Sequence, residues 1–273
     1  MHPTRRDFLV VGSAVAAAGL VSPVFAAPEP VPDAFPSHPP DLAREMVGVS
    51  HANLARVKEL VAARPSLAKA AWDWGFGDTE TALGAASHVG NREIAEFLIA
   101  NGARPDLFTA AMLGWLDVVK ALVAANPALT RLKGPHSIPL LAHAEAGGER
   151  AKPVLEYLRT LDGSGEWPDD RPLSAAEIEA LVGSYRFGPG SRDVLVVDRQ
   201  KGGRMRGQLT VQRGEGTSRN LFHLGERVFQ PAGAEAVRLR FSAESPAGTL
   251  TVLEPAPGVR ATRASASASP RAG

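Results

Sequence analysis

Apolar residues follow two different periods along this chain. From Asp41 to Thr160 they recur at helical spacing, in stretches rich in Ala and Leu such as ANLARVKELVAARPSL. From Arg171 onward they alternate with polar residues in short runs, as in Val237–Phe241, and GPG, KGG and GEG turns separate the runs. An acidic stretch with Gly and Pro, residues 162–172, divides the two textures. The pattern predicts a helical region followed by a separate β-region.

The helical region repeats itself. A shift of 62 positions aligns Ala52–Leu67 with Gly114–Leu129, and nine of the sixteen aligned residues are identical. A third unit, Thr81–Asp106, lies between them, and a fourth and more divergent one reads IPLLAHAEAGG followed by PVLEYL. Each unit predicts a first helix of small residues and a second with a Leu, Ile and Val stripe. Such units bury their apolar faces only when neighbours stack.

These units resemble ankyrin repeats, and the resemblance extends from Asp41 to Leu161. The second unit matches the ankyrin pattern at Thr81, Leu83, Ala86, Gly90, Ile94, Leu98, Ile99, Gly102 and Ala103. It departs from the pattern at Ala82, where ankyrin repeats usually have Pro, and at Gly84, where they usually have His. The resemblance implies a solenoid of about four helix pairs joined by hairpin fingers.

The lengths of the connections predict unequal fingers. Gly90 and Gly114 are 24 residues apart, whereas a full ankyrin repeat has about 33, so the second finger should be missing. Ala52 and Gly90 are 38 apart, and the excess falls in AWDWGFGD, an enlarged first finger whose glycines suit a tight tip. The stretch 131–139 is predicted to form the third finger.

The β-region opens with a capping box, in which Ser174 and Glu177 predict the start of a short helix. Eight strand candidates follow and predict a small antiparallel barrel or sandwich. The region resembles the lipocalin-like domain attached to many secreted bacterial hydrolases, on the residues Gly183, Tyr185, Leu221, Gly225, Phe229 and Pro231. The resemblance implies an accessory module and says nothing about chemistry.

The first residues are typical of a targeting segment. Arg5 and Arg6 precede an apolar run and small residues at 24–26, a pattern that resembles a twin-arginine (Tat) export signal cleaved after Ala26. An anchoring helix or an ordinary basic N-terminus is the alternative, but the apolar run is shorter than the roughly 20 residues of a membrane span. The resemblance implies a bacterial protein that is exported already folded, is periplasmic or secreted, and keeps no stable membrane anchor. The predicted parts are a signal (1–26), a Pro-rich tether (27–40), the ankyrin region (41–161), a linker (162–172), the β-domain (173–264) and a disordered tail (265–273).

Composition limits the chemistry. The chain has no Cys, so disulfides and thiolate sites are excluded. Its formal net charge is +1. Residues 41–160 carry 13 basic and 13 acidic side chains, and residues 171–273 carry 15 and 9, with the basic ones dispersed over predicted strands. This distribution does not favour nucleic-acid binding. Nucleophile elbows and phosphate-binding loops are also absent.

The histidines of the helical region invite a metal hypothesis, but none of them are spaced i,i+4 on one helix. His88 is expected to bond a backbone carbonyl between repeats or to meet Asp73 or Asp78, and His136 to brace its loop. Asp73, Asp78 and Glu80 are expected on an exposed finger, with ordinary pKa values. The sequence therefore predicts no catalytic residue, no metal site and no cofactor.

The predicted function is that of an exported, non-enzymatic interaction protein that binds a protein partner. We expect one finger Trp to fold back onto the array and the other to be exposed. The expected contact residues of the finger and first-helix groove are Trp72, Asp73, Trp74, Phe76, His88, Phe108, Met112 and Trp115. Phe108 and Trp115 are expected where a ligand would replace the missing finger. One alternative makes the β-domain a cup for a small apolar or carbohydrate ligand, with the array as a docking surface. Another is a hydrolase built on His88, Asp73 and Ser87.

Overall fold

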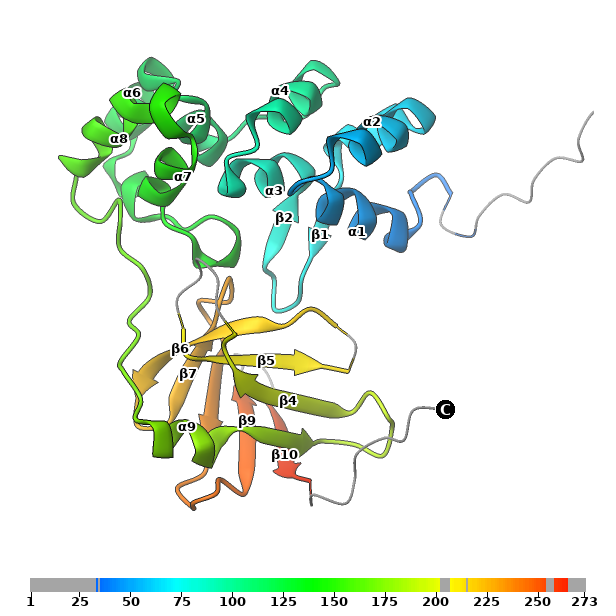
Figure 1. Ribbon diagram of the computed structural model, residues 1–273, viewed down its shortest axis with the longest axis vertical. Coiled ribbons are helices and arrows are strands. Elements are labelled where there is room, and N and C mark those ends of the chain that lie inside the picture. The colour runs from blue at the N-terminus through cyan, green and yellow to red at the C-terminus, as the bar shows by residue number, and fades with distance from the viewer. Residues whose placement is uncertain (1–32, 34, 202–206, 215, 254–257, 265–273) are drawn as a thin grey trace, which may run out of the picture. The chain divides into compact units, whose positions relative to one another are not determined.

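The computed structural model describes residues 33, 35–201, 207–214, 216–253 and 258–264. The signal segment with Arg5 and Arg6, most of the tether and the tail lie outside these residues. Eight of the described helices form four consecutive pairs (Figure 1). The pairs are α1 (Pro40–Val49) with α2 (Leu54–Ala63), α3 (Ala82–Val89) with α4 (Arg92–Ala100), α5 (Leu107–Leu113) with α6 (Leu116–Ala125), and α7 (Leu140–Ala146) with α8 (Lys152–Arg159).

The structure confirms the internal repeat of 62 positions. Helix α2 and the 3₁₀ helix η1 (Pro65–Lys69) match α6 and η2 (Pro127–Arg131) end for end at this shift. The residues that join the helices have nearly equal backbone angles, with φ −145° and ψ 89° at Arg64 and φ −149° and ψ 97° at Asn126. Equal sequence has therefore produced equal local structure.

The first helix of each pair packs on that of the next, so α3 contacts α1 and α5, and α5 contacts α7. Helix α3 also contacts α7 directly. Short side chains make this close approach possible, since α3 and α5 bury Ala85, Ala86, Ala110 and Ala111. The second helices supply larger apolar residues to the same cores, among them Ile94 of α4 and Val119 of α6.

The three connections between the helix pairs differ in the way the sequence predicts. Strands β1 (Ala71–Asp73) and β2 (Thr79–Thr81) form an antiparallel hairpin whose tip contains Gly75 and Gly77 at φ 111° and 80°. Residues 101–106 join α4 to α5 without strands, so the second finger is missing as expected. The third finger contains a bridge between Lys133 and Pro139 and the 3₁₀ helix η3 (Pro135–Ser137).

The predicted β-region is a closed eight-stranded antiparallel barrel. The capping box of Ser174 and Glu177 starts α9 (Ala175–Leu181), as expected. Around the barrel the strands follow the order β10-β3-β4-β5-β6-β7-β8-β9. The bounds are β3 (Gly183–Arg186), β4 (Val194–Arg199), β5 (Leu209–Arg213), β6 (Arg219–Gly225), β7 (Val228–Pro231), β8 (Arg238–Phe241), β9 (Thr249–Leu253) and β10 (Val259–Arg263). Closure leaves no free edge strand.

Side chains fill the barrel core. Tyr185, Phe229 and Phe241 pack edge to face inside it, with ring centroids 5.4–5.5 Å apart. The Tyr185 hydroxyl donates a hydrogen bond of 2.7 Å to the carbonyl of Leu181. Buried aliphatic residues from β4, β5, β8 and β9 complete the cluster. The packed core weighs against the alternative in which the barrel is a ligand cup.

Among the described residues, no helix has both the length and the apolar content needed to cross a bilayer.

The glycine that follows α5 is a sensitive point of the repeat. Gly114 has φ +77°, and a Cβ built on it would lie 2.2 Å from the carbonyl oxygen of Arg150. Gly102 has φ +92°, but nothing lies within 4 Å of its Cβ position. We predict that Gly102→Ala costs about 1 kcal/mol of unfolding free energy, from backbone strain alone. Gly114→Ala should cost about 3 kcal/mol, because overlap adds to strain. Urea unfolding of the two variants measures the difference, and equal losses would contradict it.

Candidate metal centre

The first finger carries a buried acid rather than an exposed one. Alternation along β2 leaves Thr79 and Thr81 exposed and turns Glu80 inward, where the side chain is 0% exposed. Asp78, at the end of the hairpin tip, is 3% exposed. The expectation that both carboxylates lie on an exposed finger is therefore wrong, because the finger packs against its neighbours.

Four side chains that can ligate a metal converge beside this hairpin, and their donor atoms all lie within 4.8 Å of one another. His51 lies in the turn between α1 and α2, and Glu80 lies on β2. His88 is in the last turn of α3, and His136 is in η3. Each ligand therefore comes from a different structural element.

The distances between donor atoms suit one small cation. His88 Nε2 lies 3.0 Å from His51 Nε2 and 2.9 Å from Glu80 Oε1. Glu80 lies 3.6 Å from His136 Nε2 through Oε1 and 3.7 Å from His51 Nε2 through Oε2. Zinc held tetrahedrally by four ligands at about 2.0–2.1 Å separates its donors by about 3.3 Å. These four separations fall on both sides of that value, and the remaining donor pairs lie within 4.8 Å.

A second layer of contacts orients these ligands. His51 Nδ1 lies 3.0 Å from the carbonyl of Gly48, and His136 Nδ1 lies 2.7 Å from Asp78 Oδ2. Both acceptors place the ring proton on Nδ1 and leave Nε2 free to face the cluster, as metal-bound histidines usually do. Trp74 Nε1 donates to Glu80 Oε2 at 2.8 Å. Glu80 Oε1 is buried and has no partner in hydrogen-bonding geometry among the described residues.

The missing second finger brings the third finger to this site. Because residues 101–106 form no hairpin, the loop that carries His136 reaches the first finger directly. The loop also packs on α3, since the Pro135 ring lies within van der Waals distance of Gly84, 3.7 Å from its Cβ position. The space where we expected an external ligand is thus partly filled by the chain's own third finger.

The charges of the cluster depend on one another. Burial opposes protonation of His136, but interactions with Asp78 and Glu80 outweigh it and raise the His136 pKa to about 9. Burial also opposes ionisation of Glu80, yet His136 and His88 bring its pKa well below the usual carboxyl value. Burial lowers the pKa of His88 in spite of Glu80. In the metal-free protein protonated His136 therefore offsets part of the negative charge of Asp78 and Glu80, and a dication bound at its Nε2 could supply that charge instead.

The aromatic residues of the finger mostly pack inward. Trp72 and Trp74 are both half-buried against the helical core, so the expectation that one of them is exposed is wrong. Asp73 is exposed, and its Oδ1 accepts from the backbone N–H of Gly75 at 2.7 Å. Phe76 is 38% exposed, and the Arg219 guanidinium lies 5.8 Å from its ring centroid.

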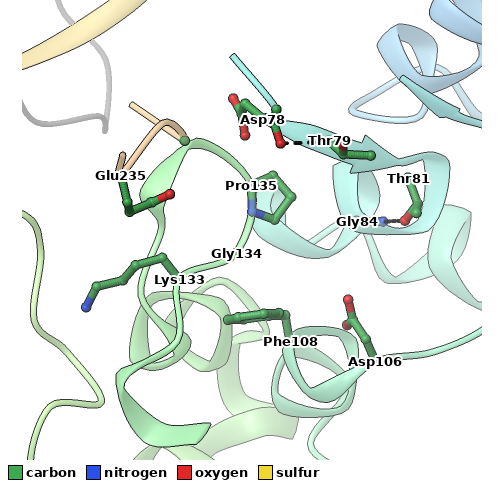
Figure 2. Close-up of a pocket in the computed structure, with 12 residues that line it drawn as sticks. Asp78, Thr79, Thr81, Gly84, Asp106, Phe108, Lys133, Gly134, Pro135 and Glu235 are labelled. Atoms are coloured by element: carbon green, nitrogen blue, oxygen red, sulfur yellow. Dashed lines mark hydrogen bonds between the residues drawn. The ribbon is translucent and has the colours of Figure 1, made fainter. Parts of the chain in front are cut away.

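The other predicted contact residues are divided between core and surface. Met112 is 0% exposed and belongs to the core, whereas Trp115 is 38% exposed at the start of α6. Phe108 lies against the ring of His143 and lines a cavity of about 280 Å³. Figure 2 shows Phe108 and Asp106 on one side of this cavity and Pro135 on the other. The cavity lies at the shortened connection, where Phe108 was expected, and the four metal-ligating residues do not line it.

The three groups proposed for a hydrolase do not assemble. Ser87 Oγ donates to the carbonyl of Leu83 at 2.7 Å and lies 3.1 Å from Thr109 Oγ1. Asp73 bonds within its own turn, while the Nε2 atom of His88 faces His51 and Glu80. This alternative has no geometric support among the described residues.

Reasoning from sequence considered His51, His88 and His136 as possible ligands and set them aside. It did not consider Glu80 as a ligand, and it expected His88 to contact a backbone carbonyl, Asp73 or Asp78 instead of His51 and Glu80. It asked only whether two histidines share one helix face, and this site takes one ligand from each of four elements. One signal was available, since these residues lie in the turns, fingers and helix ends that an ankyrin-like pattern places along one edge.

No protein-family model matches the chain, and no curated protein matches it.

His143 shows what a structural histidine looks like in this protein. Its side chain is 1% exposed, and burial, only partly offset by the bond from Nδ1 to Pro139, lowers its pKa to about 4. The unfolded chain takes up this proton near pH 6.5, so the contribution of neutral His143 to stability is complete above that pH and is lost as the pH falls toward 4.

We predict that lowering the pH from 7.5 to 5 costs about 2 kcal/mol of unfolding free energy through His143. His143→Gln should remove that part of the pH dependence of urea unfolding, and an unchanged pH dependence would show that the group does not titrate as described.

Proposed function

We propose that this protein binds one divalent transition-metal ion, with zinc as the best candidate, through His51, Glu80, His88 and His136. The observation that supports the proposal is the convergence of three imidazole nitrogens and a carboxylate on a space of the size of one ion. The contacts at Nδ1 of His51 and His136 add support, because an acceptor at Nδ1 assigns Nε2 as the ligating nitrogen.

The donor set favours zinc over other ions. Imidazole and carboxylate ligands suit Zn(II), whereas Mg(II) and Ca(II) prefer sets made only of oxygen. Four donors from the protein form a complete tetrahedral set, which is typical of structural rather than catalytic zinc. In this role the ion would join the α1–α2 turn, the first finger, α3 and the third finger at one point.

The proposal predicts binding with a defined stoichiometry and a gain in stability. Protein stripped with a chelator should bind one equivalent of Zn(II) or Co(II), measured by titration calorimetry and by visible absorption of Co(II). At a free zinc concentration 100 times the Kd, the free energy of unfolding should rise by about 2.7 kcal/mol. Removing an outer contact of a metal ligand weakens metal binding by up to about 100-fold, and removing the ligand itself should cost at least as much. We therefore expect zinc affinity to fall by about 100-fold or more in each of the variants His51→Ala, His88→Ala and His136→Ala.

His38→Ala provides the matched control, because His38 bonds Ser66 and is not among the four grouped ligands. It should bind zinc like the wild type. Absence of zinc binding by the stripped wild type, or equal affinities in His88→Ala and wild type, would contradict the proposal. The cluster would then be an ion-pair network centred on protonated His136.

We further propose that the metal centre belongs to an ankyrin-type array of about four repeats, which a lipocalin-like barrel follows in the chain. The internal repeat and the consecutive helix pairs support the first part, and the order of the strands supports the second. Export to the periplasm or beyond rests on the pattern at Arg5 and Arg6. A route that exports folded proteins suits a protein that folds around a metal ion. A non-enzymatic role stays part of the proposal.

Binding of a protein partner is a second candidate function, and the surface of α6 favours it. Trp115, Val118 and Leu122 are spaced for one helix face and are 38%, 45% and 38% exposed. The predicted groove offers less, because Trp72, Trp74, His88 and Met112 are half-buried or buried. If a Trp115→Asp, Leu122→Asp double variant retains every partner of the wild type in a pull-down, α6 is not the binding surface.

A further inference from the structure

Asp78 binds the third finger at two points. Its Oδ1 accepts the backbone N–H of His136 at 2.9 Å, and its Oδ2 accepts from His136 Nδ1 at 2.7 Å. Arg219 Nη1 donates to the same Oδ2 at 3.2 Å and to the carbonyl of Ala232 at 2.7 Å. The carboxylate is thus fully engaged although it is almost inaccessible to water.

The backbone that Asp78 holds is in an unfavourable conformation. His136 has φ 60° and ψ 24°, and Ser137 has φ 59°, both in the left-handed region that side chains disfavour. Two such residues in succession persist only where surrounding contacts fix them. Ser137 Oγ supplies further contacts, since it donates to Glu235 at 2.7 Å and accepts from the N–H of Gly233 at 2.7 Å. Of the residues that the structure describes, only Asp78 bonds both the backbone N–H and the ring Nδ1 of His136.

We propose that Asp78 is the positioning residue of the metal centre, which it serves by fixing the ring orientation and tautomer of the ligand His136. The proposal rests on the metal site proposed above. In the metal-free protein the protonated His136 ring faces Asp78 through Nδ1 and Glu80 through Nε2, which lies 3.6 Å from Glu80 Oε1. When an ion replaces the Nε2 proton, Asp78 keeps the other proton at Nδ1, so that Nε2 is the ligating atom. Carboxylates that orient ligand histidines in this way also make the imidazole a stronger donor. Asp78 touches no reacting atom and acts through His136.

The test compares four proteins in zinc affinity, measured by competition with a chelator, and in the absorption spectrum of their Co(II) forms. Asp78→Ala should bind zinc about 10–100 times more weakly than wild type and shift the Co(II) spectrum. Asp78→Asn should lose less than Asp78→Ala, because its amide oxygen can still accept from Nδ1–H, although its NH2 group then faces the backbone N–H of His136. Asp117→Asn alters an exposed carboxylate in the first turn of α6 and should match wild type in both measurements.

The outcomes separate the two proposals. If the wild type binds no zinc, the metal site itself is wrong and the role of Asp78 falls with it. If the wild type binds zinc and Asp78→Asn and Asp78→Ala match its affinity and Co(II) spectrum, the metal site stands and the positioning role is overturned. Should Asp78→Ala fail to fold, Asp78→Asn decides the matter, since it is nearly the same size. A changed Co(II) spectrum with partial loss of affinity supports positioning, whereas unchanged affinity and spectrum oppose it.

Discussion

A carboxylate without access to water stays ionised only when charges or hydrogen bonds replace its hydration, and Glu80 is 0% exposed. The replacements come partly from its own hairpin and the helix that follows, and partly from His51 and His136 far along the chain. His51, His88 and His136 surround the carboxylate from three other elements, and Trp74 donates to it at 2.8 Å. The need to satisfy one buried charge therefore fixes the first finger against a helix, a turn and the third finger. A metal ion at the same point would meet that need with a stronger charge.

This arrangement depends on a finger that is absent. In the ankyrin-type array proposed above, a complete hairpin at residues 101–106 would stand between the first and third fingers, where Asp78 and Glu80 now contact His136. The direct contact of α3 with α7 reflects the same omission. The short connection at residues 101–106 looks at first like a loss of the repeat pattern. It allows the third finger to contact the first one, and the candidate site lies at that contact. The cavity beside Phe108 is the part of that space left unfilled.

The sequence predicted what local pattern controls. It located the helix pairs, the enlarged first finger, the missing second one, the capping box at Ser174 and all eight strands of the barrel, because each follows from spacing, caps or alternation over a few residues. It failed where the outcome depends on tertiary contact. The burial of Glu80, the inward packing of both finger tryptophans and the meeting of His88 with His51 depend on how the fingers lie against each other. No period or motif encodes a site with one ligand from each of four elements.

Protein structures also contain buried ion-pair networks that hold no metal, and His136, with a pKa of about 9, can fill the centre of this one with a proton. The coordination of zinc by these side chains is the central claim. X-ray absorption at the zinc edge of protein loaded with one equivalent tests it most directly. The account predicts three imidazole nitrogens and one carboxylate oxygen at about 2.0–2.1 Å. A shell with fewer than three imidazoles, or one made of water and surface carboxylates, would contradict it.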